Sequence, residues 1–213
     1  MGRLQTYRAI RELGRQIHSD ALKDVPKSVF LRGAERLGMM GKGKVLLFDS
    51  EDETDVLAQF LLYEIPQGEK PIIQHHLDKR GAPQNTMEEE LFRAIRDSFS
   101  SLFRIETGRG EGIVVRNLLT PDEGLHTLVD IGLIQTARAG FLLFTRLLPL
   151  REYAITGGVS FPFAGHHETA LSKEDLKLRK SARQDELSMR RYVVFHRLGK
   201  TMGLPMEFGE PAG

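Results

Sequence analysis

In the first hundred residues, apolar positions recur every three or four residues, which is the spacing of one face of a helix. The first such series comprises Leu4, Tyr7, Ile10, Leu13, Ile17 and Ala21. Pro26 is expected in the first turn of a second helix, which Gly38 ends. Thr86 and Glu89 form a capping-box pattern that opens a further helix, and its apolar face is predicted to run on through Phe99 to Leu102. The region 1–102 is therefore expected to be mainly helical.

One apolar run in this region does not have helical spacing. Residues 45–48, Val-Leu-Leu-Phe, are all apolar, and such a short run predicts a buried strand. Ser50 and Glu53 then form a second capping-box pattern, so a helix is expected to begin here. Its first turn is rich in carboxylates, which the helix dipole stabilises. This helix should bury Val56, Leu57, Phe60 and Leu61.

From residue 103 to residue 163 the pattern changes to short apolar runs separated by glycine, proline and aspartate. This pattern is typical of an antiparallel sheet joined by hairpins. Turns are predicted at 108–110 and 120–124, and Gly157-Gly158 is expected at a bulge or tight corner. Residues 141–148 are almost wholly apolar and are therefore placed in a central strand. Five or six strands in about sixty residues suggest a small, barrel-like sheet.

The last part of the chain, 166–213, is predicted to be a C-terminal helix and a loose tail. Ser172 and Asp175 are expected to open one long helix that reaches about Leu198. Its apolar stripe is weak, so the helix should be largely exposed on one side. The fold class is α+β: helices packed around a small antiparallel, barrel-like sheet. The three regions 1–102, 103–165 and 166–213 are expected to form one compact unit.

Composition excludes several classes of function. The 213 residues include no cysteine, so disulfides, thiol catalysis and cysteine-ligated zinc are ruled out. No apolar run approaches the roughly 20 residues that span a bilayer, and the N-terminus has no signal-peptide core. A cytoplasmic location is therefore expected. The formal net charge is +1, although basic ends flank an acidic middle. No global field favours nucleic acid.

Two stretches together resemble a loose group of uncharacterised bacterial proteins. The first is LLFDSEDETDVLAQFLLYE, residues 46–64, and the second is the strand-rich region with NLLTPDEG, LLFTRLLP and ITGGVSFPF. In that group an FDSEDE-like helix start precedes strands that end in an SGVxFxF-like run. The resemblance covers roughly residues 25–170. It implies a soluble bacterial protein and no particular activity.

The acidic cluster that follows the predicted strand is the first candidate for chemistry. A strand that ends in Asp49 and is followed by Asp52 and Asp55 could hold Mg²⁺, as in a phosphodiesterase or nuclease-like enzyme. Helix capping and the helix dipole account for the same carboxylates without a metal. Both interpretations stay open, with these three aspartates as the catalytic candidates.

Two histidine pairs are the candidate metal ligands. His75-His76 precedes Asp78, and His166-His167 precedes a glutamate, so the pairs could bind a transition metal if the fold brought them together. Neighbouring side chains on a strand point to opposite faces, which would exclude one histidine of each pair. The alternative is that these are ordinary surface histidines.

The basic C-terminal region could neutralise an anionic partner through Arg179, Arg183, Arg190 and Arg191. In a nucleic-acid-binding module, Tyr192 or Phe195 would stack on a base. Acidic residues interrupt the series, however, and a solvated, ion-paired helix is the competing interpretation.

The sequence contains no complete phosphate-binding, nucleophile-elbow or dinucleotide motif, so no cofactor is expected. The favoured function is binding or regulation in the bacterial cytoplasm without catalysis. Its partner would be another protein or a second copy of the chain. The metal-dependent phosphodiesterase and the nucleic-acid-binding module are the alternatives.

Overall fold

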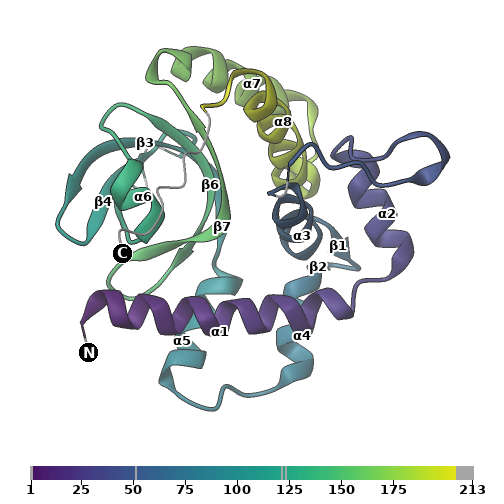
Figure 1. Ribbon diagram of the computed structural model, residues 1–213, viewed down its shortest axis with the longest axis horizontal. Coiled ribbons are helices and arrows are strands. Elements are labelled where there is room, and N and C mark those ends of the chain that lie inside the picture. The colour runs from purple at the N-terminus through teal and green to yellow at the C-terminus, as the bar shows by residue number, and fades with distance from the viewer. Residues whose placement is uncertain (1, 51, 121, 123, 205–213) are drawn as a thin grey trace.

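The computed structural model describes residues 2–50, 52–120, 122 and 124–204, and its ribbon is shown in Figure 1. The predicted loose tail, 205–213, lies outside the described residues. The helices are α1 (Arg3–Lys23), α2 (Lys27–Arg36), α3 (Glu53–Tyr63), α4 (Ile72–Arg80), α5 (Thr86–Arg96), α6 (Ile131–Thr136), α7 (Glu168–Ser181) and α8 (Leu187–Met202). The strands are β1 (Pro66–Gln67), β2 (Lys70–Pro71), β3 (Phe99–Arg109), β4 (Gly112–Asn117), β5 (Leu125–Leu128), β6 (Leu142–Pro149) and β7 (Ala154–Phe163). Short 3-10 turns are η1 (Lys42–Lys44), η3 (Gly165–His167) and η4 (Gln184–Glu186).

The α+β class is confirmed, and the strand-rich region lies where the apolar runs predicted it. The strands pair in the order β3-β4-β5-β7-β6, and β6 pairs back to β3, so the sheet closes on itself. The prediction of a purely antiparallel sheet is wrong, because β5 and β7 are parallel where Leu128 meets Ala154. Strand directions cannot alternate all the way around a ring of five. At least one neighbouring pair in such a ring must therefore be parallel.

Strand β6 has both faces buried, which explains its nearly continuous apolar sequence. Leu143 and Leu147 pack inside the closed sheet, against Phe103 and other inward side chains. Leu142, Phe144 and Leu148, from the alternate positions of the strand, pack against the helices outside. The prediction of a central strand is confirmed, and both alternating sets line a core. Opposite Arg146 the register with β7 shifts at Gly157-Gly158, so the predicted bulge is also confirmed.

Helices cover the outer face of β6 and β7 (Figure 1). The predicted single C-terminal helix is wrong, since α7 ends at Ser181 and α8 begins at Leu187. The expectation that this region buries little is wrong as well. Phe195 of α8 stacks on Phe144 with ring centroids 4.2 Å apart, and the Tyr192 hydroxyl donates to the Val56 carbonyl at 3.1 Å. Both aromatic residues are therefore core residues and cannot stack on a base.

Neither predicted capping box forms at the predicted residues. At α5 the N-cap is Asn85, whose side chain accepts from the Glu88 amide at 3.0 Å, while Glu88 accepts from the Gln84 amide at 2.6 Å. The box therefore lies one residue before the predicted Thr86–Glu89. At α3 the N-cap is Asp52, whose side chain makes no capping hydrogen bond, so the predicted start at Ser50 is wrong. Glu53 accepts from the Asp49 amide at 2.7 Å.

The helix predicted to reach Leu102 ends earlier. Helix α5 stops at Arg96, and Phe99 already belongs to β3. Ile95 and Phe99 are four residues apart, a spacing that fits both one face of a helix and one face of a strand, so the boundary could not be read from the pattern. The short helix α6, between β5 and β6, was not predicted: it has only six residues and none is fully buried, although Ile131, Leu133 and Ile134 pack partly against the cores.

The predicted buried strand at 45–48 is wrong. This segment forms the second arm of a small hairpin, held by backbone bonds from Gly41 to Val45 and from Leu47 to Met39. Val45 and Leu47 are 58% and 57% exposed. The hairpin projects beside α2 at the right of Figure 1 and takes no part in the closed sheet. In the described part of the chain, no helix has the length and apolar character needed to cross a membrane.

Candidate functional site

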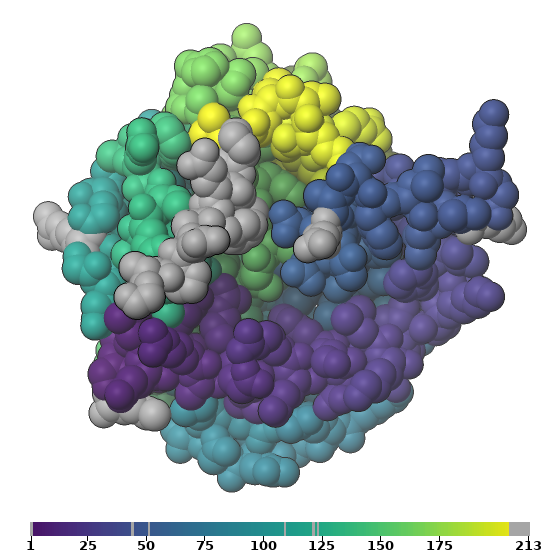
Figure 2. Space-filling model, viewed as in Figure 1, coloured from purple at the N-terminus to yellow at the C-terminus, as the bar shows by residue number. Residues whose placement is uncertain are grey.

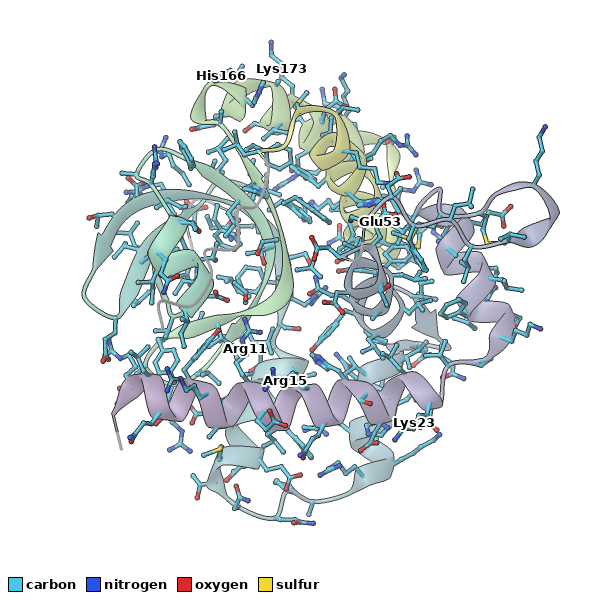
Figure 3. The ribbon with its side chains drawn as sticks, viewed as in Figure 1. Arg11, Arg15, Lys23, Glu53, His166 and Lys173 are labelled. Atoms are coloured by element: carbon cyan, nitrogen blue, oxygen red, sulfur yellow. The ribbon has the colours of Figure 1, made fainter. Side chains whose placement is uncertain are left out.

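A cavity of about 690 Å³ lies between α1, α3 and the β6/β7 side of the closed sheet. Figure 3 shows Arg11 and Arg15 on the side of α1 that faces this space. The apolar part of its lining comprises Tyr7, Ile10, Leu22, Ala58, Leu62, Tyr63, Leu91, Ile131, Leu148, Ile155 and Val159. The polar part comprises Arg8, Arg11, Arg15, His18, Ser19, Asp55, Gln59 and Thr156. Its size is that of a site for a small molecule.

Arg11 is the centre of a hydrogen-bonded polar cluster at this cavity. Its Nη2 donates to Asp130 Oδ2 at 2.7 Å and to Thr156 Oγ1 at 2.6 Å, and its Nη1 donates to the Thr156 carbonyl at 2.7 Å. Its Nε donates to the Tyr7 hydroxyl at 3.0 Å. Thr156 in turn donates to Asp130 at 2.6 Å. The guanidinium is therefore fixed between α1 and β7, and the Asp130 charge is compensated.

Two further arginines stand on the same side of α1. Arg8, Arg11 and Arg15 follow at intervals of three and four residues, so they share one helical face. Arg8 and Arg15 are exposed, and among the described residues the ion pair of Arg15 is the surface pair with Glu12. Gly14 lies among them, and a methyl group added there would meet nothing within 4 Å. This helix thus presents cations beside an open space.

His18 and Tyr63 close one wall of the cavity, with His18 Nε2 and the Tyr63 hydroxyl oxygen 2.7 Å apart. Burial, with a smaller effect from the Arg11 charge, lowers the pKa of His18 to about 4. Burial raises the pKa of Tyr63 well above its ordinary value. At neutral pH both side chains are uncharged, so they add no charge to the cavity.

Behind Tyr63 lies a buried ion pair between Glu64 and Arg146, whose side chains are 0% and 5% exposed. The Arg146 guanidinium lies over the Tyr63 ring, 4.6 Å from its centroid. Glu64 also accepts from Ser100 at 3.0 Å and from Ser188 at 2.6 Å. This network joins the end of α3 to β3, β6 and α8, and so fixes the wall that carries Tyr63.

The bulge of β7 forms another part of the cavity wall. Gly157 lies so close to α3 that a Cβ atom there would approach Gln59 Oε1 to 2.7 Å, and Gly158 has a φ of +112°. Gln59 accepts from the Val159 amide at 3.3 Å. Only glycine suits both positions of this bulge, which brings the backbone of β7 to the edge of the cavity.

A family model matches residues 1–209 of the chain. The protein belongs to the family of unknown function DUF7986. The expected resemblance to proteins without an assigned activity is thereby confirmed. Comparison with curated proteins and with solved structures found no match. Membership of DUF7986 therefore brings no activity with it, and the function has to be inferred from the geometry.

The three candidate catalytic aspartates do not surround a common point. Asp49 pairs with Lys200 Nζ at 2.8 Å, and that hydrogen bond lowers the Asp49 pKa. Asp52 and Asp55 are exposed, and Asp55 lines the cavity. Lys200 also contacts the buried Glu53, labelled in Figure 3. Among the described residues, no group of three or more His, Asp or Glu could hold a metal ion.

The two histidine pairs lie far apart. His75 and His76 are on α4, in the lower part of Figure 1, whereas His166 lies at the top of Figure 3, drawn from the same side. His75 Nε2 contacts the Gln67 carbonyl at 2.5 Å, and His76 Nδ1 lies 3.4 Å from Asp24. His167 stands beside His166 in η3. The fold therefore does not bring the pairs together.

Each of the four C-terminal arginines lies beside a carboxylate. Arg179 and Arg191 both bind Asp175, which is buried between α7 and α8. Arg190 pairs with Glu186 at 2.8 Å, and Arg183 with Asp185 at 3.3 Å. Arg191 holds α8 to α7, whereas the Arg179 pair lies within α7. All four arginines have part of their charge compensated. Binding of nucleic acid by this region stays a prediction without a test.

Sequence reasoning missed the cavity residues on α1. A signal was present, because Arg8, Arg11, Arg15 and His18 share one face with Gly14. A polar face on an amphipathic helix is ordinarily solvated, so the pattern by itself does not indicate a site there. Its partners Asp130 and Thr156 lie more than a hundred residues away in sequence, and no local pattern connects them to Arg11.

Proposed function

We propose that the protein is a non-catalytic binding protein for a small organic anion, which it takes up in the cavity between α1, α3 and β7. The observation that carries this proposal is the combination of an apolar lining with the arginine row of α1. An apolar pocket with a few placed polar groups is the usual form of a small-molecule site. The ligand would carry a carboxylate on an apolar body.

The charges around the cavity support an anion. Three arginines and one aspartate line it, and His18 is uncharged at neutral pH. Asp130 compensates Arg11, so Arg8 and Arg15 supply the charge available to a ligand. The surface pair of Arg15 with Glu12 is worth little in water and competes weakly.

The same groups favour binding over acid–base catalysis. A general acid or base works best with a pKa near the working pH. The pKa of His18 lies at about 4 and that of Tyr63 is raised, so neither exchanges a proton readily at neutral pH. Asp130 accepts hydrogen bonds from Arg11 and Thr156 at once, so its carboxylate is already engaged within the protein.

Isothermal titration with octanoate, benzoate and octanol tests the proposal. We expect both carboxylates to bind and octanol, which lacks the charge, to bind about tenfold more weakly or worse, a difference of roughly 1.4 kcal/mol. Replacing Arg8 and Arg15 together by Gln should weaken octanoate binding and leave octanol unchanged. The matched control is Arg32→Gln, an exposed arginine of α2 that does not line the cavity.

Gly14→Leu provides an independent test, because its side chain would enter the open space beside Arg11. Binding of all three compounds should be lost, while Gly14→Ala keeps it. If no carboxylate binds, or if octanoate binds Gly14→Leu as well as the unchanged protein, the cavity is not the ligand site.

A further inference from the structure

Tyr7 brings to the cavity a hydroxyl group whose hydrogen is unused. Its side chain lines the cavity, and the residue is only 6% exposed. The hydroxyl oxygen accepts from Arg11 Nε at 3.0 Å. A tyrosine hydroxyl also carries a hydrogen that it can donate, and no acceptor among the described residues receives it. A buried donor without an acceptor costs free energy, which an oxygen atom of a bound ligand would recover.

Arg11 fixes this hydroxyl in place and polarises it. The guanidinium is itself held by Asp130 and Thr156, and its Cζ lies 5.3 Å from the centre of the Tyr7 ring. Because the hydroxyl accepts from a charged group, its own hydrogen becomes a stronger donor. The donor is therefore oriented before a ligand arrives, which lowers the entropic cost of binding.

The other hydroxyl groups of the cavity lining are paired or exposed. The Tyr63 hydroxyl shares a hydrogen bond with His18, and the Thr156 hydroxyl donates to Asp130 at 2.6 Å. Ser19 is exposed. Tyr7 is thus the hydroxyl of the lining that combines burial, a fixed position and a hydrogen free to donate.

Cations lie close to Tyr7 along α1. Arg8 follows it directly, and Arg15 lies about two turns further on. In Figure 2 the surface of α1 forms a purple band across this face of the molecule. Both arginines are exposed on that helix, whereas Tyr7 is buried. A carboxylate at the cavity would therefore meet the Tyr7 hydroxyl on its inner side and the charge of an exposed arginine on its outer side.

We propose that Tyr7 selects the head group of the ligand, because its hydroxyl donates to a carboxylate or carboxamide oxygen of the bound molecule. The oxygen acceptor and the negative charge are then recognised by different residues: Tyr7 binds the acceptor, and Arg8 and Arg15 attract the charge. An uncharged carboxamide should accordingly bind as well, through Tyr7. The role of Tyr7 rests on the proposed function, since it concerns the same cavity.

Titration with benzoate, benzamide and toluene, followed by ligand-observed NMR, separates these contributions. The three compounds share one ring: benzoate offers an acceptor and a charge, benzamide an acceptor alone, and toluene neither. We expect the unchanged protein to bind benzoate most tightly and toluene most weakly. Tyr7→Phe should weaken benzoate binding about tenfold and benzamide binding several-fold, and leave toluene unchanged, because only the donor is lost. Replacing Arg8 and Arg15 together by Gln should weaken benzoate and leave benzamide unchanged.

The matched control is Tyr153→Phe, which removes a hydroxyl from a half-buried tyrosine that does not line the cavity. It should alter the binding of none of the three compounds. If the unchanged protein binds no benzoate, the proposed function fails and the role of Tyr7 fails with it. If benzoate binds equally well to Tyr7→Phe, the role of Tyr7 alone is overturned.

Three further results would overturn the role of Tyr7. The first is an equal loss of benzamide and toluene binding in Tyr7→Phe, which would show that the residue only shapes the cavity. The second is a loss of benzamide binding in Tyr63→Phe in place of Tyr7→Phe. The third needs no variant and so does not depend on whether Tyr7→Phe folds: it is benzamide binding to the unchanged protein no more tightly than toluene.

Discussion

His18 shows how position changes the chemistry of a single residue. In sequence it is one histidine on the polar side of an amphipathic helix. In the fold it lies at the wall of the cavity, hydrogen-bonded to Tyr63, and burial lowers its pKa from 6.5 to about 4. His196, beside Glu53 and Lys200, has its pKa lowered to about 4 as well, mainly by burial. Both are uncharged in the folded protein at neutral pH.

The lowered pKa of His18 predicts how stability depends on pH. Above pH 6.5 the residue is neutral in both the folded and the unfolded chain and has no effect. Between pH 6.5 and about 4 the unfolded chain binds a proton that the folded chain does not, so the free energy of unfolding falls as pH falls. The slope from this residue is at most about 1.4 kcal/mol per pH unit.

Urea unfolding of His18→Gln should therefore show a shallower loss of stability on acidification than the unchanged protein. His166→Gln, an exposed histidine, is the control, and equal slopes for all three proteins would contradict the prediction.

At the scale of elements, β6 is the strand on which both cores rest. Phe144 is 1% exposed and stacks on Phe195, whereas Phe141 lies just before the strand and is half-buried. We expect Phe144→Ala to lower the free energy of unfolding by about 3–5 kcal/mol, because a cavity remains where the ring was. Phe141→Ala should cost clearly less. Chemical denaturation measures both, and Phe144→Leu should recover part of the loss. A larger cost at Phe141 than at Phe144 would show that the strand is placed wrongly.

At the scale of the whole molecule, the Glu64–Arg146 pair joins the helical side to the closed sheet. Glu64 ends α3, Arg146 lies in the middle of β6, and the serine partners of Glu64 lie on β3 and α8. Glu64→Gln leaves the Arg146 charge buried and uncompensated, which should cost roughly 3–5 kcal/mol. The double variant Glu64→Gln/Arg146→Met should lose less than the sum of the two single variants, because no unpaired charge remains. Denaturant unfolding of the four proteins gives this double-mutant cycle, and strict additivity would show that the pair does not act as a unit.

Local pattern in the sequence was sufficient for most elements. The apolar series of α1 and α3, the first part of the series of α5, the runs of β6 and β7 and the paired glycines of the bulge appear where periodicity and turn chemistry placed them. These features depend on residues that are close together in the sequence, so the local pattern is enough to predict them. The two capping boxes show the limit of such a pattern. Helix α5 begins one residue earlier than predicted, so that Asn85 and not Thr86 is its N-cap. Helix α3 begins later than predicted, with Asp52 and not Ser50 as its N-cap.

Only the tertiary structure decided which surfaces are buried and which residues meet. The run at 45–48 is as apolar as a buried strand, yet no strand of the closed sheet is free to pair with it, so it lies exposed. The weak stripe of α8 is buried because Tyr192 and Phe195 fill space against β6 and α3. The parallel β5/β7 pair follows from closing a ring of five strands. Arg11, Asp130 and Thr156 come together from three distant parts of the chain. The sequence determined the elements because their causes are local, whereas the cavity and its charges depend on contacts between residues that local periodicity cannot relate.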